Sequence, residues 1–199
     1  MCFEMYELFQ SFSNFTSRSD VLPCYDTFSR PTDDNNCWEY CYDRDDYLSD
    51  QLVNIVSKQG LDGINIDYEH CYDIDTHQNG KCLQKTRKYS DAKAQGFLYR
   101  LTAGLRDKLD DLQASNGHVG RYELSHSPID EDLLPHSSYY QILKMRNDDL
   151  TFLMPKFYNG VTRPRVDGTS GGSYSAVSIF HDLAANLFDN EPEKVRKTL

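Results

Sequence analysis

The sequence contains no long uninterrupted run of apolar residues. No segment approaches the roughly 18–20 apolar residues that a membrane-spanning helix needs, and the start lacks the basic stretch and apolar stretch of a signal peptide. We therefore expect no membrane partner and no signal peptide within this chain. A hydrophobic content of 39%, with 13% aromatic residues, still argues for a folded domain rather than wholesale disorder.

Positive charge is scarce. The chain has 21 Lys and Arg residues against 31 Asp and Glu residues, which gives a net charge of −10. The basic residues are dispersed, whereas phosphate binding depends on clustered Lys and Arg side chains. We expect no nucleic-acid partner and a neutral substrate, and the sequence makes no prediction of the oligomeric state.

The chain lacks any Cys-x-x-Cys pair, although it has six cysteines, at positions 2, 24, 37, 41, 71 and 82. Zinc coordination by these thiols with His70 or His77 is therefore disfavoured. The segment from Asp75 to Gly80 weakly resembles a calcium loop, but Thr86 stands where the closing acid would be needed. We expect no metal and no cofactor.

Disulfide bonding is the favoured interpretation of the cysteines. They crowd the first half of the chain together with an N-glycosylation sequon, Asn14-Phe15-Thr16, which indicates a secreted or lumenal protein. A bond between Cys71 and Cys82 would close a polar loop. The pairing stays open, because six cysteines allow about fifteen connectivities.

Hydrophobic periodicity predicts alternating helices and strands after an irregular first region, 1–42, which holds at most a short helix near residues 4–12. The expected helices span 43–58, 90–115, 138–146 and 173–187, and the expected strands span 61–68, 122–127 and 150–158. This order is typical of an α/β protein with a parallel sheet.

The run at 61–69 carries polar side chains at every second position. Asn65, Asp67 and Glu69 would share one face of a strand, because successive side chains point to opposite faces. A solvated polar face would explain this alternation in an antiparallel sheet. The βα order favours a parallel sheet covered on both sides, and in a barrel the catalytic groups lie at the carboxyl ends of the strands, where Glu69 falls.

Residues 62–69, Asp-Gly-Ile-Asn-Ile-Asp-Tyr-Glu, resemble the DGxDxDxE signature of family 18 glycoside hydrolases, the chitinases and their relatives. Residues 156–159, Lys-Phe-Tyr-Asn, are similar to the Gln-Phe-Tyr-Asn that follows a later strand in plant and fungal type members. The resemblance spans roughly residues 43–187 and implies a (β/α)8 barrel, with 61–68, 122–127 and 150–158 as its fourth, fifth and sixth strands.

The predicted fold class is therefore α/β, a partial TIM barrel covering roughly the third to the sixth helix. We expect an irregular cysteine-containing region at 1–42 and the partial barrel at 43–199. No Ser-x-Gly-Gly strand precedes the motif, and the sole tryptophan, Trp38, lies far from the last strand, where the family places one. We interpret the chain as a fragment of a larger barrel.

The resemblance also implies the roles of individual residues. Glu69 would protonate the scissile glycosidic oxygen, Asp67 would stabilise the intermediate, and the Tyr158 hydroxyl would hold the acetamido carbonyl of the substrate. Further residues would line the sugar site: Asn65, Tyr68, Met154 and Asn159.

Two positions depart from the family pattern. Asn65 stands where the family most often has an Asp, and Lys156 replaces the usual Gln. The leading hypothesis is hydrolysis of β-1,4-linked N-acetylglucosamine polymers, because Glu69 is kept. The alternatives are a non-catalytic sugar-binding lectin on the same barrel and an endo-β-N-acetylglucosaminidase acting on N-glycans.

Overall fold

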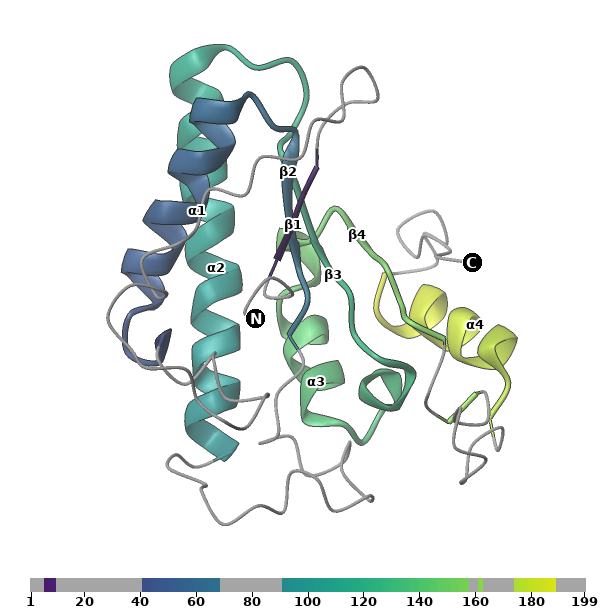
Figure 1. Ribbon diagram of the computed structural model, residues 1–199. Helices are drawn as coiled ribbons and strands as arrows, with labels where there is room; N and C mark the ends of the chain where they lie inside the picture. Colours follow the sequence, from purple (N-terminus) through teal and green to yellow (C-terminus); the bar gives the residue numbers. More distant parts are fainter. Residues whose placement is uncertain (1–5, 10–40, 69–90, 158–160, 163–173, 189–199) are drawn as a thin grey trace.

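A computed structural model (Figure 1) describes residues 6–9, 41–68, 91–157, 161–162 and 174–188. The elements in chain order are β1 Tyr6–Phe9, α1 Asp45–Gln59, β2 Gly63–Ile66, α2 Asp91–Asn116, β3 Glu123–His126, η4 Asp130–Leu133, α3 Ser138–Met145, η5 Asn147–Asp149, β4 Phe152–Leu153 and α4 Ala176–Asn186. The predicted helix–strand alternation from α1 to α4 is confirmed.

The four strands form one sheet in the order β1-β2-β3-β4. β2 pairs with β3 and β3 with β4 in parallel, as expected for successive βα units. β4 is shorter than the predicted strand 150–158, but pairing resumes at a parallel bridge between Ile129 and Lys156. The structure therefore fits part of a (β/α)8 barrel, and closure into a barrel is not seen in the described ranges.

Strand β1 differs from the sequence prediction. Residues 1–42 were expected to be irregular with at most a short helix near 4–12, yet Tyr6–Phe9 is a strand that runs antiparallel to β2. The edge of β2 presents unpaired backbone groups, and a short segment rich in aromatic residues can satisfy them. A segment of four residues is too short to show a helical or an alternating pattern in the sequence. Its conformation depends instead on its pairing with β2.

The helices begin and end at the signals that the sequence contains. α1 starts with Asp45 and Asp46 and ends at Gly60, whose φ of 63° is left-handed and whose N–H donates to the carbonyl of Val56. Ser137 and Ser175 cap the amino ends of α3 and α4 with their side-chain oxygens. No helix within the described ranges is both long enough and apolar enough to cross a membrane.

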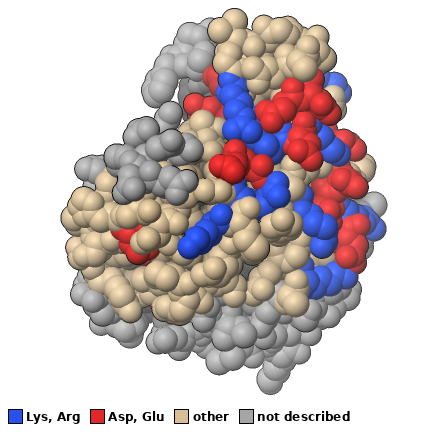
Figure 2. Space-filling view, turned by 180° about the vertical axis from the view of Figure 1, so that it is seen from behind, with Lys and Arg blue, Asp and Glu red and all other residues tan. Residues whose placement is uncertain are grey.

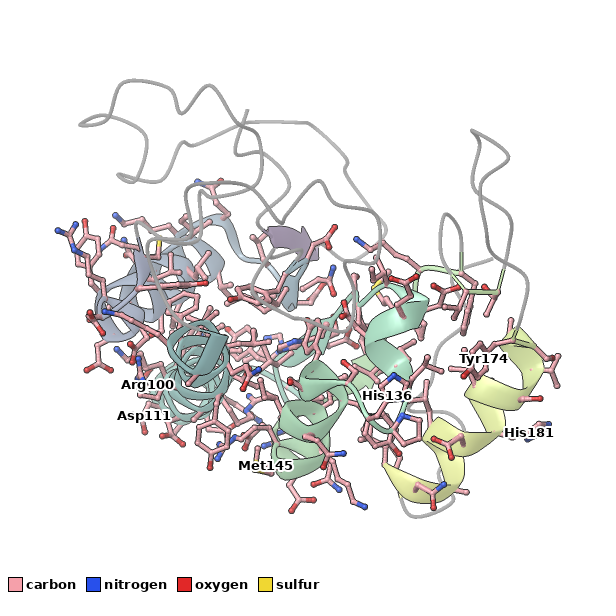
Figure 3. All side chains as sticks on the ribbon, turned by 90° about the horizontal axis from the view of Figure 1, so that it is seen from below. Arg100, Asp111, His136, Met145, Tyr174 and His181 are labelled. Atoms are coloured by element: carbon pink, nitrogen blue, oxygen red, sulfur yellow. The ribbon has the colours of Figure 1, made fainter. Side chains whose placement is uncertain are left out.

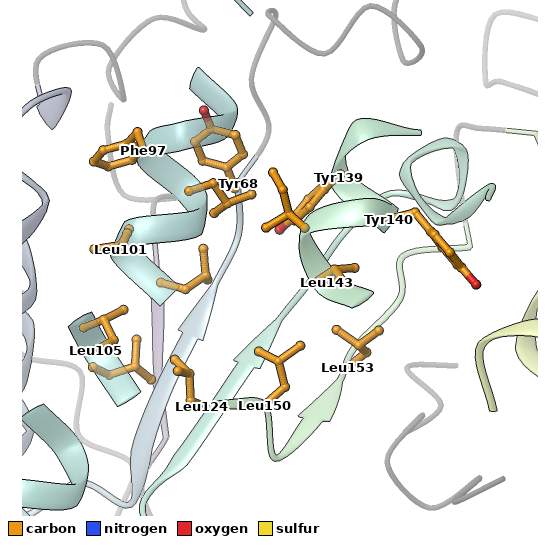
Figure 4. Packing of buried hydrophobic residues seen from close by; sticks show 14 of the residues in the cluster. Tyr68, Phe97, Leu101, Leu105, Leu124, Tyr139, Tyr140, Leu143, Leu150 and Leu153 are labelled. Carbon is orange, nitrogen blue, oxygen red and sulfur yellow. The ribbon is translucent and has the colours of Figure 1, made fainter. Parts of the chain in front are cut away.

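One side of the sheet packs against the helices (Figure 4). Leu124 lies on this side, facing the stripe of Phe97, Leu101 and Leu105 on α2. Ile64, which pairs with Leu124, and Ile66 are fully buried in the same core cluster. Burial of each such side chain contributes about 1.5–3 kcal/mol. In the view from below, the helices follow one another across the molecule, marked by Arg100 on α2, Met145 on α3 and His181 on α4 (Figure 3).

Ion pairs join the outer surfaces of α1 and α2. Arg100 contacts Asp45 at 3.1 Å, and Lys108 contacts Asp50 at 2.5 Å. Figure 2 shows acidic and basic side chains interleaved over this side of the molecule rather than separated by sign. Exposed pairs of this kind contribute little individually, typically about 0–1 kcal/mol.

A buried arginine lies near the amino end of β3. Arg106 on α2 is 2% exposed, donates to the carbonyl of Tyr122 at 2.8 Å and pairs with Asp110 at 2.6 Å. Burial acts to raise the pKa of Asp110, but hydrogen bonds and charges from Arg121 and Arg106 outweigh it and hold the pKa below its usual value. This cluster ties α2 to the start of β3.

His126, the last residue of β3, is fully buried on the helix side. The Thr102 hydroxyl donates to the carbonyl of Leu98 at 2.8 Å, so it accepts from Nε2 of His126, 3.2 Å away. Nδ1 then accepts from the hydroxyl of Tyr139 at 2.9 Å. Both contacts suit the neutral ring, and burial lowers the pKa of His126 to about 3.

Gly63 begins β2 at a point of close backbone approach. A Cβ on this residue would lie 2.1 Å from the carbonyl oxygen of Glu123, which opposes it across the sheet. Real Cβ atoms do not approach backbone atoms so closely, so any larger residue forces β2 and β3 apart. The Gly of the motif is therefore required by packing between strands.

We expect Gly63→Ala to lower the free energy of unfolding by about 1–3 kcal/mol or more, because the added methyl group collides with backbone that cannot rotate away. Gly104→Ala is the matched control, since its Cβ would meet only ordinary contacts with Ser49. Alanine is also about 1 kcal/mol more favourable than glycine in a helix. Denaturant unfolding of both variants checks this, and equal stability of the two would contradict it.

Acidification should destabilise the chain through His126. Its folded pKa of about 3 lies below the ordinary value of 6.5, so its contribution is fully present above pH 6.5 and is lost as the pH falls toward 3. At pH 5 the loss is about 2 kcal/mol. Urea unfolding at pH 7 and pH 5 should show a smaller pH dependence for His126→Gln than for the exposed control His136→Gln.

Candidate functional site

The side of the sheet that faces away from the helices carries the polar residues of the strands. Asn65 of β2 opposes Ser125 of β3, which opposes Phe152 of β4. Because side chains alternate along a strand, the residues two positions further along each chain lie on this same side, as does the residue four positions after Phe152. We call this surface the polar face, and it consists of Asn65, Asp67, Ser125, Ser127, Phe152, Met154 and Lys156.

Asn65 is fully buried at the centre of the polar face. Its amide nitrogen donates to the hydroxyl oxygen of Ser127 at 2.7 Å, and its carbonyl oxygen accepts from the hydroxyl of Ser125 at 2.8 Å. A buried amide without such partners would cost several kcal/mol, of order 2–7. Ser125 of β3 and Ser127, just after this strand, therefore hold a neutral amide where the family motif most often has a carboxyl group.

Asp67 and Lys156 form an ion pair at the carboxyl ends of the strands. Nζ of Lys156 lies 2.6 Å from Oδ1 of Asp67, and their side chains are 10% and 20% exposed. The Lys156 backbone N–H also donates to the carbonyl of Pro128 at 2.9 Å. Because water screens this pair poorly, its orientation is better defined than that of a surface pair.

The structure places Tyr68 on the opposite side of β2 from Asn65 and Asp67. Its ring packs against Phe97 and Tyr139, and its hydroxyl is bonded to Tyr42 at 3.0 Å and to the carbonyl of Ala94 at 3.2 Å. Figure 4 shows the ring beside α2, within the helix-side core. This side of the strand is occupied by helices, so we leave Tyr68 out of the proposed sugar site.

Three predicted site residues, Glu69, Tyr158 and Asn159, lie outside the described residues. Met154 lies on the polar face and is partly exposed. The structure therefore brings together Asn65, Asp67 and Met154 of the predicted set. Their position is the one at which parallel sheets bind ligands, beyond the carboxyl ends of the strands.

The cysteine predictions are mostly outside the described ranges as well. Cys41 is buried, and Cys71 and Cys82 are not described, so their disulfide stays a prediction. Within the described residues, no group of three or more His, Cys, Asp and Glu side chains could hold a metal ion. His70 and His77, the histidines considered for zinc, lie outside these residues.

Sequence reasoning missed the two serines that hold Asn65. Ser125 and Ser127 occupy every second position of β3 and its extension, in the same pattern as Asn65 and Asp67 on β2. That alternation was present in the sequence of the predicted strand 122–127. It was overlooked because a serine on a short strand is equally compatible with a solvated surface.

No protein-family model and no curated protein match the chain. Among solved structures, the chain is similar to a GH18 chitinase from Pseudoalteromonas aurantia, with a TM-score of 0.57 and 24% identity over 85% of this chain and 53% of that one. A GH18 chitinase from Chromobacterium violaceum matches at a TM-score of 0.44 and 23% identity over 56% of this chain and 16% of that one.

The first of these similarities concerns the fold, because its sequence identity is low. The chain spans about half the length of the chitinase from P. aurantia. The same family was indicated independently by the motif at 62–69, whose Asn65 and Asp67 the structure places on the polar face, toward the carboxyl end of β2. The resemblance predicted from the sequence is therefore confirmed at the level of fold: the chain folds like part of a GH18 chitinase.

Proposed function

We propose that the chain forms part of a chitinase-like glycoside hydrolase that cleaves β-1,4 linkages between N-acetylglucosamine units. The observation that carries this proposal is the polar face of a chitinase-like sheet, where Asp67 of the motif pairs with Lys156 and Asn65 of the motif is held by two serines. The alternation of the motif assigns Glu69 to the same side as Asp67.

The proposed reaction uses the substrate's own acetamido group as nucleophile. Glu69 donates its proton to the glycosidic oxygen while the acetamido carbonyl oxygen bonds to the anomeric carbon and the bond from that carbon to the leaving group breaks. Water then attacks the anomeric carbon and opens the cyclic intermediate, and Glu69 takes the proton from this water. The anomeric configuration is retained.

Asp67 and Tyr158 would support the acetamido group. An anion beside the acetamido N–H stabilises the positive charge that develops on the cyclic intermediate. Tyr158 would donate to the carbonyl oxygen and hold it for attack, which is a positioning effect. Asn159 and Met154 would line the same sugar site.

Lys156 gives Asp67 a different neighbour from the one that the family motif supplies. The residue two positions before Asp67 is an amide already bonded to two serines, so no carboxyl group shares a proton with Asp67 from that position. The ammonium group of Lys156 instead pairs with the Asp67 carboxylate on the polar face. We propose that this ion pair orients Asp67 for the reaction.

A second candidate function, a non-catalytic sugar-binding protein, is favoured by the same contacts. Asn65 and Asp67 are both engaged with protein groups, the amide with two serines and the carboxylate with Lys156. An endo-β-N-acetylglucosaminidase acting on N-glycans would use the same groups as the chitinase. Activity assays on chitin oligosaccharides and on N-glycans separate these three functions.

Glu69→Gln should lower hydrolysis of chitin oligosaccharides by roughly 10²–10⁴-fold, because glutamine cannot donate a proton to the leaving oxygen. Binding of the oligosaccharides, measured by calorimetry, should be retained. Glu123→Gln, at the amino end of β3 and therefore away from the proposed site, is the control and should keep its activity. Unchanged turnover in Glu69→Gln would remove the catalytic assignment, and binding without turnover in the parent chain would favour the lectin.

Lys156→Met should lower kcat by roughly 10–100-fold, because Asp67 loses the group that orients it. Lys156→Gln should retain more activity than the Met variant, since an amide can still donate a hydrogen bond to the carboxylate. The exposed Lys144→Gln on α3 serves as control. Full activity in Lys156→Met, with an unchanged melting temperature, would show that the ion pair has no role in orienting Asp67.

A further inference from the structure

Asp130 is a fully buried residue at the start of η4, the short helix that follows β3. It accepts the backbone N–H of Val161 at 3.1 Å on one oxygen. The other oxygen accepts the N–H of Thr162 at 2.8 Å and also the Thr162 hydroxyl. Three donors of Val161 and Thr162 therefore converge on the Asp130 side chain. The donors follow β4 in the chain, whereas Asp130 follows β3.

These bonds continue a pairing that starts at the sheet. The backbone N–H of Lys156 donates to the carbonyl of Pro128 at 2.9 Å, and Ile129 forms a parallel bridge with Lys156. The carbonyl of Val161 also accepts the N–H of Tyr174, just before α4, at 3.1 Å. Figure 3 places Tyr174 at the start of this helix. Residues 156 and 161–162 are thus both tied to the loop after β3.

The chemistry of the three donors requires a carboxylate at this position. Both oxygens of Asp130 accept, whereas an asparagine would turn an NH2 group toward one set of N–H and O–H donors. Burial of an ionised carboxylate is costly unless hydrogen bonds compensate it. Bonds from backbone N–H groups to a charged acceptor are stronger than those to a neutral one. The clamp is therefore specific to aspartate.

We propose that Asp130 is a positioning residue for the candidate sugar site. By clamping residues 161–162 it fixes the course of the chain that follows β4, which carries Lys156 and, shortly before the clamp, Tyr158. This inference rests on the proposed hydrolase function. Asp130 acts through these residues and is not itself assigned a contact with substrate.

The test uses the full chain with two kinds of measurement. Amide hydrogen exchange of a peptide covering residues 157–163 reports the clamp directly, and kcat and KM on chitin oligosaccharides report its effect on the reaction. Asp130→Asn should increase exchange in this peptide by roughly tenfold or more. It should lower kcat by roughly 10–100-fold with little change in KM. The exposed Asp148→Asn, near the other end of β4, is the control.

A milder pair of variants at Thr162 keeps the test informative if Asp130→Asn unfolds the whole chain. Thr162→Val removes only the hydroxyl donor, and Thr162→Ser restores it, so the Val variant should show a partial loss of kcat that the Ser variant recovers. Unchanged exchange in both Asp130→Asn and Thr162→Val overturns the clamp. Faster exchange with unchanged kcat overturns the positioning role. An inactive parent chain overturns the proposed hydrolase function, and the positioning role in hydrolysis with it.

Discussion

Strand β2 is buried on both faces, and its alternating side chains meet two different environments. Ile64 and Ile66 face the helices, while Asn65 faces Ser125 and Ser127. The pairing of β2 with β3 decides which residues lie on each side, because the period of a strand is two. The helix packing, the polar face and the meeting of Asp67 with Lys156 all depend on this one register.

The sequence predicted the helices well because their signals are local. α1 has acids in its first turn and a glycine at its end, and the stripe of α2 is long enough for its period to be unambiguous. β1 could not be predicted, since four residues carry no period and their conformation follows from the open edge of β2. The ion pair of Asp67 with Lys156 joins residues 89 positions apart. Their parallel strand order could be inferred, but the orientation of a long lysine side chain could not.

The two departures from the family motif make physical sense together. Replacing an acid by Asn65 removes a negative charge, and replacing an amide by Lys156 adds a positive one. On the polar face, the positive charge of Lys156 is paired with the negative charge of Asp67. A surface with balanced charge suits an uncharged sugar, and the buried amide needs only two hydroxyl groups to satisfy it.

The close backbone approach at Gly63 has a consequence for how this chain can change over time. A shift of β2 by one residue along β3 would bring a side chain into the space that only glycine fits, and it would exchange the polar and apolar faces. Insertions and deletions within the strand are therefore excluded by sterics and by solvation at once. Length variation among relatives should accumulate in the connections between strands and helices, where neither constraint applies.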